Sequence, residues 1–531
     1  MPTGRQTIGG REYVYEYVSV WNREKGRSEQ RREYLGRIID GEFVPNKKWL
    51  LKQELQEEKA VNKRGPKAVH DCKRTFAGAT YLLDKIGEVT GVTRDLEACF
   101  GARYKEILSL AYYLILEQGA PMYRFSKWAT THEHPFEKDI PSQRSSELLP
   151  LMTEQRKMEF LRRQAKRRPE KEYLFFDSTS ISSYSEQLKQ VKYGKNKDGD
   201  NLAQINLALL LGQESGLPAY YRKIPGNITD VMTVEKILSG IDYLDIQKVM
   251  LVMDRGYYSE SNVNELYRKH CKFILGAKVS LKFVQKLLSE QRTDFDRHEN
   301  FHGESELFIH TKMIDWAYHE TKKTGEDVNE KRRMYVHIYY NDQHATDDKI
   351  RLNKMLVSLE EDMRSGKPLS VEREKTCRKY YSVTQTPVRG ISLTPKQETI
   401  NEARKNFGFF VLLSNGEKDP VEALRIYRAK DLVEKAFLDL KDRLSLRRTS
   451  VASEENLEGK IFLQYIALIY LSYIKREMDS AKLFKNHSMQ SLFDHLDVIE
   501  LYQQPGHSPY FGEITHKQRA LFEAFNIQPP S

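Results

Sequence analysis

Two aspartates in this chain each follow a short apolar run. Asp177 follows the run 173–176, and Asp254 follows the run 248–253. We expect both runs to be buried strands that end at their aspartates. The aspartates would then lie at the carboxyl ends of the strands, which is where ligands bind in open α/β sheets. Two carboxylates held close together repel each other unless a cation lies between them, and their hard oxygens favour Mg²⁺ or Mn²⁺. An aspartate after a strand is also typical of a helix N-cap or a turn, so this alternative stays open.

A third carboxylate lies on a long helix expected over residues 422–444. At about 100° per residue, Tyr427, Lys430, Glu434 and Lys441 fall within about 60° of one another, and apolar residues occupy the opposite side. The polar face therefore presents a carboxylate between two ammonium groups and a phenol, which are groups that can bind a metal and phosphate oxygens. An ordinary amphipathic helix with a Lys430–Glu434 ion pair explains the same pattern, and the sequence leaves both interpretations open.

Strands and helices must position these residues. The runs around Asp177 and Asp254, further strands over 202–211, 218–224 and 273–277, and an intervening helix indicate an α/β layer. Residues 280–405 break that rhythm with strand-like pieces and a charged helix, and strand signal returns at 407–414. An apolar helix over 457–474 follows the proposed glutamate helix.

The N-terminal part has a different pattern. Residues 13–20 and 32–36 predict a β-hairpin with a basic tip, and residues 59–67 predict a basic linker. Helical periodicity covers 76–118 and 145–168. The end of the second helix is strongly basic, because residues 156–171 hold eight Lys or Arg and two acids. That run fits either a solvated helix end, where the helix dipole favours cations, or a contact with the DNA backbone.

Composition limits the class of protein. The 531 residues include 85 Lys or Arg and 75 Asp or Glu, which gives a net charge of +10 and favours a polyanionic partner such as nucleic acid. The four cysteines form no CxxC pair, so a disulfide framework or zinc ribbon is not expected. The apolar stretch 461–474 is shorter than the roughly 20 residues of a membrane span, so we expect a buried helix and no membrane contact. No secretory signal is expected, and a reducing interior compartment fits best.

The motifs, taken in order, resemble bacterial insertion-sequence DDE transposases, the cut-and-paste group with a ribonuclease-H-like core and a Tyr-x2-Arg-x3-Glu-x6-Lys signature. Tyr427, Glu434 and Lys441 match this signature with its spacing intact. Lys430 replaces the usual arginine, which keeps the charge but loses the planar bidentate fork. Asp177-Ser-Thr and Asp254-Arg-Gly-Tyr-Tyr resemble the motifs of the first and second aspartates. The segments 193–198, 216–218 and 225–230 look like the connections of the same core.

The resemblance implies a fold and a division of the chain. The expected fold is an α/β ribonuclease-H-like catalytic core interrupted by a mostly β insertion domain, with a mixed hairpin and helical N-terminal region and a helical C-terminus. The expected parts are an N-terminal hairpin region and basic linker (1–70), a helical DNA-binding region (71–170), the first part of the core (171–279), the insertion domain (280–405), the second part of the core with the glutamate helix (406–475) and a C-terminal region (476–531).

The resemblance also implies a mechanism. Asp177, Asp254 and Glu434 would be the catalytic and metal-binding residues and would hold two Mg²⁺ or Mn²⁺ ions for in-line displacement at phosphorus. Tyr427, Lys430 and Lys441 would position phosphates of the DNA. We also expect DNA contacts from Arg255, in the motif of the second aspartate, and from Trp316, which lies among aromatic and basic residues of the insertion. Trp316 fits either a role stacking on an extruded base or a place in a core or interface.

The expected function is that of a DNA transposase that binds the terminal inverted repeats of an insertion sequence and catalyses metal-dependent strand cleavage and strand transfer. Its partners would be double-stranded transposon ends and target DNA, with a homodimer in the synaptic complex because two ends must be joined. The expected location is the bacterial cytoplasm, on the nucleoid when bound to DNA. Two alternatives remain: a domesticated, non-catalytic DNA-binding protein or repressor, and a ribonuclease-H-like nuclease without strand transfer.

Overall fold

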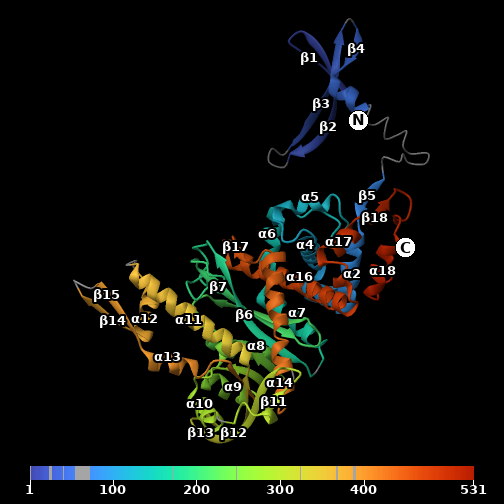
Figure 1. Ribbon diagram of the computed structural model, residues 1–531. Coiled ribbons are helices and arrows are strands. Elements are labelled where there is room, and N and C mark those ends of the chain that lie inside the picture. The colour runs from blue at the N-terminus through green and yellow to red at the C-terminus, as the bar shows by residue number, and fades with distance from the viewer. Residues whose placement is uncertain are drawn as a thin grey trace. The chain divides into compact units, whose positions relative to one another are not determined.

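The computed structural model describes residues 2–22, 27–39, 41–53, 72–169, 171–246, 248–292, 294–322, 324–365, 369–386 and 390–531 (Figure 1). These residues form two compact units. The first comprises Met1–Arg74 and Tyr502–Tyr510, and the second comprises Thr75–Leu501 and Phe511–Ser531. The basic linker expected over 59–67 lies outside the described residues.

The first unit contains a four-stranded antiparallel sheet in the order β1-β2-β3-β4. Its strands are β1 (Thr3–Ile8), β2 (Arg11–Asn22), β3 (Arg27–Ile39) and β4 (Glu42–Pro45). The hairpin predicted from residues 13–20 and 32–36 is confirmed, because β2 pairs with β3 along its length with one irregularity between Val14 and Tyr15. Gly36 is required where β3 meets β4, since a Cβ there would lie 2.3 Å from the Val44 carbonyl oxygen.

The second unit begins with helices, as the periodicity of 76–118 and 145–168 predicts. They are α2 (Gly78–Thr90), α3 (Val92–Phe100), α4 (Tyr104–Leu116), α5 (Phe125–Ala129), α6 (Ser142–Leu148) and α7 (Glu154–Ala165). Gly91, with φ of +73°, ends α2 and lets the chain turn directly into α3. Every residue of α4 from Glu106 to Leu116 is buried, so this helix passes through the interior of the unit.

A mixed sheet of ten strands lies at the centre of the second unit. Nine strands follow the order β11-β12-β13-β16-β10-β9-β6-β7-β8, and β17 pairs with β6. The strands on the side of Asp177 and Asp254 are β6 (Tyr173–Ser183), β7 (Gln204–Gly212), β8 (Pro218–Pro225), β9 (Met250–Met253) and β10 (Lys272–Ala277), with β17 (Arg448–Thr449). β6, β7 and β8 form an antiparallel meander, whereas β6, β9 and β10 run parallel. Helices α8 (Asp230–Tyr243) and α9 (Glu260–Arg268) make the crossovers from β8 to β9 and from β9 to β10, which gives an α/β core.

Residues 280–405 differ from the mostly β insertion domain expected from the sequence. After α10 (Lys282–Gln291), the strands β11 (Phe301–His302), β12 (Leu307–Thr321) and β13 (Asp327–Tyr340) extend the core sheet, because β13 pairs with β16 (Phe409–Ser414). The excursion from the sheet covers only residues 341–408 and is largely helical. It comprises α11 (Asp342–Arg364), α12 (Val371–Tyr380), α13 (Gln397–Arg404) and the hairpin of β14 (Tyr381–Thr386) and β15 (Gly390–Pro395). It has a small core of its own, formed by Leu352, Leu356, Leu359, Cys377, Tyr380, Tyr381 and Ile400.

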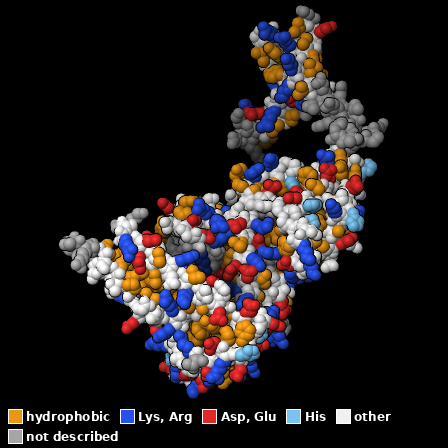
Figure 2. Space-filling view, viewed as in Figure 1, with side chains coloured by type: hydrophobic (Ala, Val, Ile, Leu, Met, Phe, Trp, Pro, Cys, Tyr) orange, Lys and Arg blue, Asp and Glu red, His pale blue; other side chains and the backbone are white. Residues whose placement is uncertain are grey.

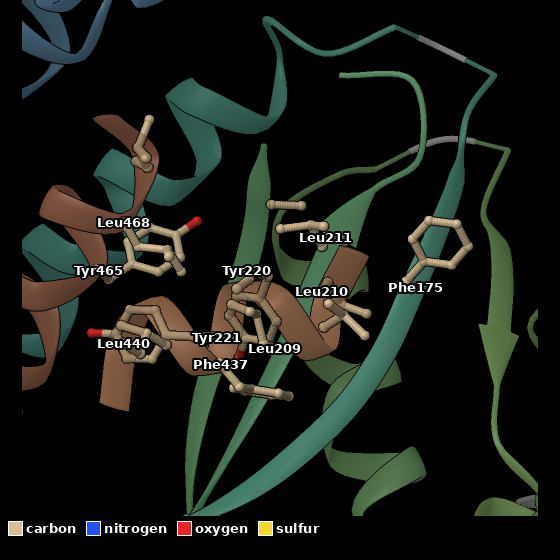
Figure 3. Close-up of a cluster of buried hydrophobic side chains, with 14 of the residues drawn as sticks. Phe175, Leu209, Leu210, Leu211, Tyr220, Tyr221, Phe437, Leu440, Tyr465 and Leu468 are labelled. Carbon is tan, nitrogen blue, oxygen red and sulfur yellow. The ribbon is translucent and has the colours of Figure 1, made fainter. Parts of the chain in front are cut away.

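The long helix α16 (Glu454–Ser480) is the central helix of the second unit. It is long and apolar enough to cross a membrane by composition alone, but 89% of its apolar window is buried inside the protein, as the prediction of a buried helix requires. Residues 431–443, which include Glu434, are called the glutamate segment. Figure 3 shows Phe437 and Leu440 of this segment and Tyr465 and Leu468 of α16 together with apolar side chains of β7 and β8. This packing fixes the glutamate segment against the sheet. The chain ends with α17 (Met489–Asp497), β18 (Glu500–Gln503), β19 (Tyr510–Phe511) and α18 (His516–Ala524).

Part of the basic run 156–171 is structural. Lys157 pairs with Glu458, Arg167 pairs with Asp95 at 2.8 Å, and Arg168 pairs with Glu172. These three cations therefore bind carboxylates of the protein itself.

One buried ionic cluster joins α7, β8 and α16, and it generates a stability prediction. Glu458 lies 2.5 Å from Lys157 Nζ and 2.9 Å from Lys223 Nζ, and each lysine side chain is only 4% exposed. Glu458→Gln should lower the free energy of unfolding by about 1 kcal/mol, because it removes the carboxylate that both buried ammonium groups share and leaves each with one other partner, Glu154 for Lys157 and Glu454 for Lys223. Urea denaturation measures this loss, and Glu455→Gln, at an exposed position of the same helix, should change the value by less than about 0.5 kcal/mol.

The same substitution has a pH signature. Burial would raise the pKa of Glu458, but the charges of Lys157 and Lys223 outweigh burial and hold its pKa below the ordinary value. A carboxylate with a lowered pKa in the folded state stabilises the protein above its unfolded-state pKa, and that stabilisation is lost as pH falls through the folded-state pKa. The difference in the free energy of unfolding between wild type and Glu458→Gln should therefore decrease as the pH falls. A difference that increases would contradict the lowered pKa of Glu458.

Candidate active site

Asp177 and Asp254 are neighbours because β6 and β9 are adjacent parallel strands. The register pairs Phe176 with Met253, so the two aspartates are the next residues on their strands. The expectation that Asp177 ends its strand is wrong: β6 continues to Ser183 because it stays paired with β7 as far as Ser182. Asp254 does end β9, and the carboxylate of Asp177 lies at the edge where that strand stops.

Each aspartate uses one oxygen for hydrogen bonds within the protein. Asp177 Oδ1 accepts from the Ser178 backbone N–H at 2.8 Å and from the Tyr257 hydroxyl at 3.0 Å. Asp254 Oδ1 accepts from the Arg255 N–H at 2.7 Å and from the Tyr427 hydroxyl at 2.8 Å. Burial would raise the pKa of Asp254, but the hydrogen bonds from Tyr427 and from the backbone N–H of Arg255 outweigh burial and lower it. Asp254 is also the N-cap of a short 3₁₀ helix, Arg255–Tyr257, so the N-cap alternative is confirmed for this residue, and its second oxygen is not used by the cap.

Glu434 joins this edge through Lys430. The Lys430 ammonium donates to Glu434 Oε1 at 2.9 Å, and Lys430 is only 8% exposed. Burial would lower the pKa of Lys430, but the bond to Glu434 and the charges of Asp177, Asp254 and Glu434 outweigh burial and raise it. The Lys430–Glu434 ion pair expected of an ordinary amphipathic helix is therefore present, but its cation is buried and interacts with all three carboxylates.

The continuous helix expected over 422–444 is interrupted. It consists of α14 (Pro420–Arg428), α15 (Asp431–Leu438) and a π-helical turn, Asp439–Arg443. The N–H groups of Lys430, Leu432 and Val433 bond to the carbonyls three residues earlier, so the backbone tightens between α14 and α15. The N–H of Leu444 bonds to the Asp439 carbonyl five residues earlier, so the backbone widens at the other end. These changes of pitch interrupt the regular helix that the sequence predicts, although Tyr427 still reaches Asp254 and Lys430 still reaches Glu434.

The polar residues of the predicted stripe consequently have different partners. Tyr427 holds Asp254, whereas Lys441 Nζ lies 2.7 Å from both carboxylate oxygens of Asp198. Lys441 is buried, with 7% of its surface exposed. Arg255 is exposed at the start of its 3₁₀ helix, beside the site.

Trp316 lies away from this constellation. It is 8% exposed on β12, its indole N–H donates to Asn264 Oδ1 at 2.8 Å, and its ring packs edge-on against Phe283. These contacts correspond to the core alternative for this residue and do not present its ring for stacking.

Sequence reasoning missed the loop between β6 and β7. Lys197 Nζ lies 3.5 Å from Asp177 Oδ1 and 3.6 Å from Asp230 Oδ1, and it donates to the Ser178 carbonyl at 2.7 Å. Lys197, Asp198 and Asp230 fall within segments 193–198 and 225–230, which the sequence singled out as connections of the core. That signal identified the segments but not the side chains that would face the site.

The donor set fits a hard divalent cation. Among the described residues, no group of three or more His, Cys, Asp or Glu side chains is arranged to hold a metal ion, and the charges of all three carboxylates act on the Lys430 ammonium instead. Within the same residues, Asp177 Oδ2, Asp254 Oδ2 and Glu434 Oε2 accept no hydrogen bond, so each carboxylate keeps one oxygen for a ligand. All-oxygen, anionic donors are those that Mg²⁺ and Mn²⁺ prefer.

The Asp198–Lys441 pair generates a prediction with an internal control. Asp198→Asn should lower the free energy of unfolding by about 3 kcal/mol, because it leaves the Lys441 ammonium, whose side chain is 6% exposed, without its carboxylate. Asp200→Asn removes a carboxylate of the same loop, but its partner Arg448 has a half-exposed side chain, so this loss should be under about 1 kcal/mol. Urea denaturation of both variants measures the difference between the two losses of unfolding free energy. Equal losses would show that burial of Lys441 does not determine the strength of the Asp198–Lys441 pair.

Comparison with known proteins assigns the chain to a family. Residues 168–470, more than half of the chain, match the transposase DDE domain family, and this range includes Asp177, Asp254 and Glu434. No curated protein sequence matches the chain. Six chains of solved structures match, among them the piggyBac transposase synaptic complex with hairpin DNA, at 10% identity and a TM-score of 0.37 over 74% of this chain and 70% of that chain. The match over 168–470 shows that the chain belongs to the DDE transposase family, whose members catalyse nucleotidyl transfer on DNA and generally use divalent metals.

Proposed function

We propose that this chain is the transposase of a bacterial insertion sequence and moves it by a cut-and-paste route. It binds the terminal inverted repeats, cleaves DNA strands at the ends and transfers them into target DNA. The observation that carries the proposal is the placement of Asp177 and Asp254 at equivalent positions of adjacent parallel strands, with Tyr427 bonded to Asp254 and Lys430 bonded to Glu434, within the region that matches the family. The Tyr427-x2-Lys430-x3-Glu434-x6-Lys441 spacing supports assignment to the group with the tyrosine, arginine, glutamate and lysine signature.

Asp177, Asp254 and Glu434 are the residues that would hold two Mg²⁺ or Mn²⁺ ions, which when bound supply Lewis-acid stabilisation for in-line displacement at phosphorus. The protein's own part is orientation. Tyr427 fixes Asp254 Oδ1 and Tyr257 fixes Asp177 Oδ1, so each aspartate directs its other oxygen away from these phenols. Lys430 carries a positive charge at the same place, where it can bind an oxygen of the scissile phosphate.

Lys441 and Arg255 suit a role in binding DNA phosphates. In the protein alone Lys441 is neutralised by Asp198, and a phosphate group of DNA offers the same pair of anionic oxygens. Arg255 is exposed beside Asp254 and is open to solvent on the same side of the sheet. A homodimer in the synaptic complex follows from the need to join two ends, and the place of action is the bacterial cytoplasm, on the nucleoid.

The proposal is tested with DNA from the chain's own genetic element. A plasmid carrying both flanks of the gene is incubated with purified protein and Mg²⁺, and excision and strand-transfer products are quantified. Glu434→Gln and Asp254→Asn should lower product formation by roughly 1000-fold while binding to the flanking DNA persists, because only the donors for the reaction are removed. Asp431→Asn, at an exposed pair on the same helix as Glu434, should retain wild-type activity.

Three results would contradict this function. Nicking without strand transfer by the wild-type protein would indicate a nuclease. Binding with no cleavage at all by the wild-type protein would indicate a DNA-binding protein without catalysis. Full nicking by Asp254→Asn would remove this carboxylate from the active site.

A second prediction concerns Lys441. Lys441→Ala should weaken binding to all DNA sequences alike and should reduce the magnitude of the slope of log Kobs against log salt by about 0.9, as expected for one lost phosphate contact. Fluorescence anisotropy at several salt concentrations measures the slope, and Lys435→Ala, at a half-exposed position one element away, is the control. A loss confined to particular sequences would mean that Lys441 contacts bases.

A further inference from the structure

The N-terminal sheet contains a two-stranded ribbon that its neighbouring strands do not cover. β1 pairs with β2 only over Arg11–Glu16, and β4 pairs with β3 only over Gly36–Ile39. Beyond these strands, β2 and β3 continue together for six residue pairs, from Tyr17 opposite Arg32 to Asn22 opposite Arg27. Figure 1 shows β2 and β3 running on past β1 and β4. We call residues 17–22 and 27–32 the ribbon.

Both faces of the ribbon are exposed. Trp21 is 63% exposed, Val18 46% and Val20 42%, although all three are apolar. A lone two-stranded hairpin is marginally stable in water, and these six residue pairs have no supporting layer. Apolar side chains exposed on such a ribbon are typical of a surface that binds a partner. The ribbon is therefore suited to a partner that contacts it directly.

The charge of the ribbon indicates the kind of partner. It contains three arginines, Arg27, Arg31 and Arg32, and one acid, Glu29. Figure 2 shows basic and apolar side chains interspersed on the visible face of this unit. A surface with this excess of guanidinium groups complements a polyanion, and double-stranded DNA carries one negative charge per about 1.7 Å of its axis.

One face of the ribbon also carries groups that recognise base edges. Alternation along the strands puts Ser19, Gln30 and Arg32 on the same face, with Tyr17 and Trp21 beside them. The Arg32 guanidinium is held in place, since it donates to Gln6 Oε1 at 2.7 Å and to Gln30 Oε1 at 3.2 Å and lies 4.7 Å from the centre of the Tyr15 ring. Arginine pairs with guanine and glutamine with adenine in the major groove, and holding the guanidinium in advance lowers the entropy cost of such a contact.

We propose that the ribbon enters the major groove of duplex DNA, with the face of Ser19, Gln30 and Arg32 toward the base edges. At about 3.4 Å per residue the ribbon is about 20 Å long. The major groove is about 12 Å wide, which admits a two-stranded ribbon. This inference rests on the proposed function, because it assigns to the ribbon the recognition of the inverted repeats that the transposase must find.

The test uses the full-length protein and a library of random-sequence 30-base-pair duplexes. Wild-type protein should enrich one motif after repeated selection. Arg32→Lys, which keeps the charge and loses the planar fork, and Gln30→Ala should each lose preference at one position of that motif by roughly tenfold to a hundredfold. Arg37→Lys is the matched control, because Arg37 is exposed on the same strand outside the ribbon, and it should select the wild-type motif.

A third variant separates base contacts from phosphate contacts. Arg31→Gln should leave the selected motif unchanged and should reduce the magnitude of the salt slope by about 0.9.

The ribbon proposal is overturned if Arg32→Lys and Gln30→Ala select the wild-type motif at wild-type strength. It is also overturned if Trp21→Ala leaves DNA binding intact but converts a dimer to a monomer in sedimentation, because the ribbon would then bind a second copy of the chain. Wild-type protein that binds no duplex at all would overturn the proposed function together with the ribbon, whereas cleavage of flanking DNA with no role for the ribbon overturns the ribbon alone.

Discussion

The site depends on compensation of charge in a partly buried place. Asp177, Asp254 and Glu434 come from two strands and a helix, and three carboxylates cannot share one edge of a sheet without a cation. Lys430 supplies it, and the raised pKa of this lysine follows from its interaction with all three. The break between α14 and α15 lies at Lys430 itself, and the packing of Phe437 and Leu440 against β7 and β8 fixes the segment that follows it (Figure 3). The break in the helix and this packing together therefore bring the Lys430 ammonium to the edge where the carboxylates lie.

The same compensation extends through the loop between β6 and β7. Lys197 lies beside Asp177 and Asp230, and Asp198 and Asp200 pair with Lys441 and Arg448. This loop places the positive Lys197 beside the carboxylate of Asp177, where a metal ion would bind. It places the negative Asp198 and Asp200 beside Lys441 and Arg448, where DNA phosphates would bind. Under the proposed function, DNA and metal ions would therefore exchange existing ion pairs for new ones, which would lower the cost of desolvating the site.

The sequence predicts the parts of the site that depend on local pattern. Asp177, Asp254 and Glu434 are predicted from the apolar runs before the aspartates, the helical stripe around the glutamate and the resemblance of their motifs to DDE transposases. The hairpin of β2 and β3 is predicted from alternation. The Asp198–Lys441 pair could not, because the two residues are 243 apart in the chain and only tertiary packing joins them. The interruption of the glutamate helix was also hidden, since apolar spacing over 422–444 is regular and the change in pitch arises from packing. Trp316 shows the same limit, because the aromatic and basic residues around it in the sequence suit either a core or a stacking surface. Only its tertiary contacts with Asn264 and Phe283 show that it belongs to the core.

The excursion over residues 341–408 is rooted at the catalytic edge, and this follows from strand direction alone. β10 is parallel to β9, with Leu275 opposite Met253, and antiparallel to β16, with Ala277 opposite Val411. The start of β16 thus lies at the same edge of the sheet as Asp254. Tyr340, which ends β13, is opposite Phe409, which begins β16, so the excursion leaves and re-enters the sheet at adjacent residues. Because its two ends meet there, its length and contents can change without disturbing the strand order, and both ends stay at the side of the sheet where the carboxylates lie.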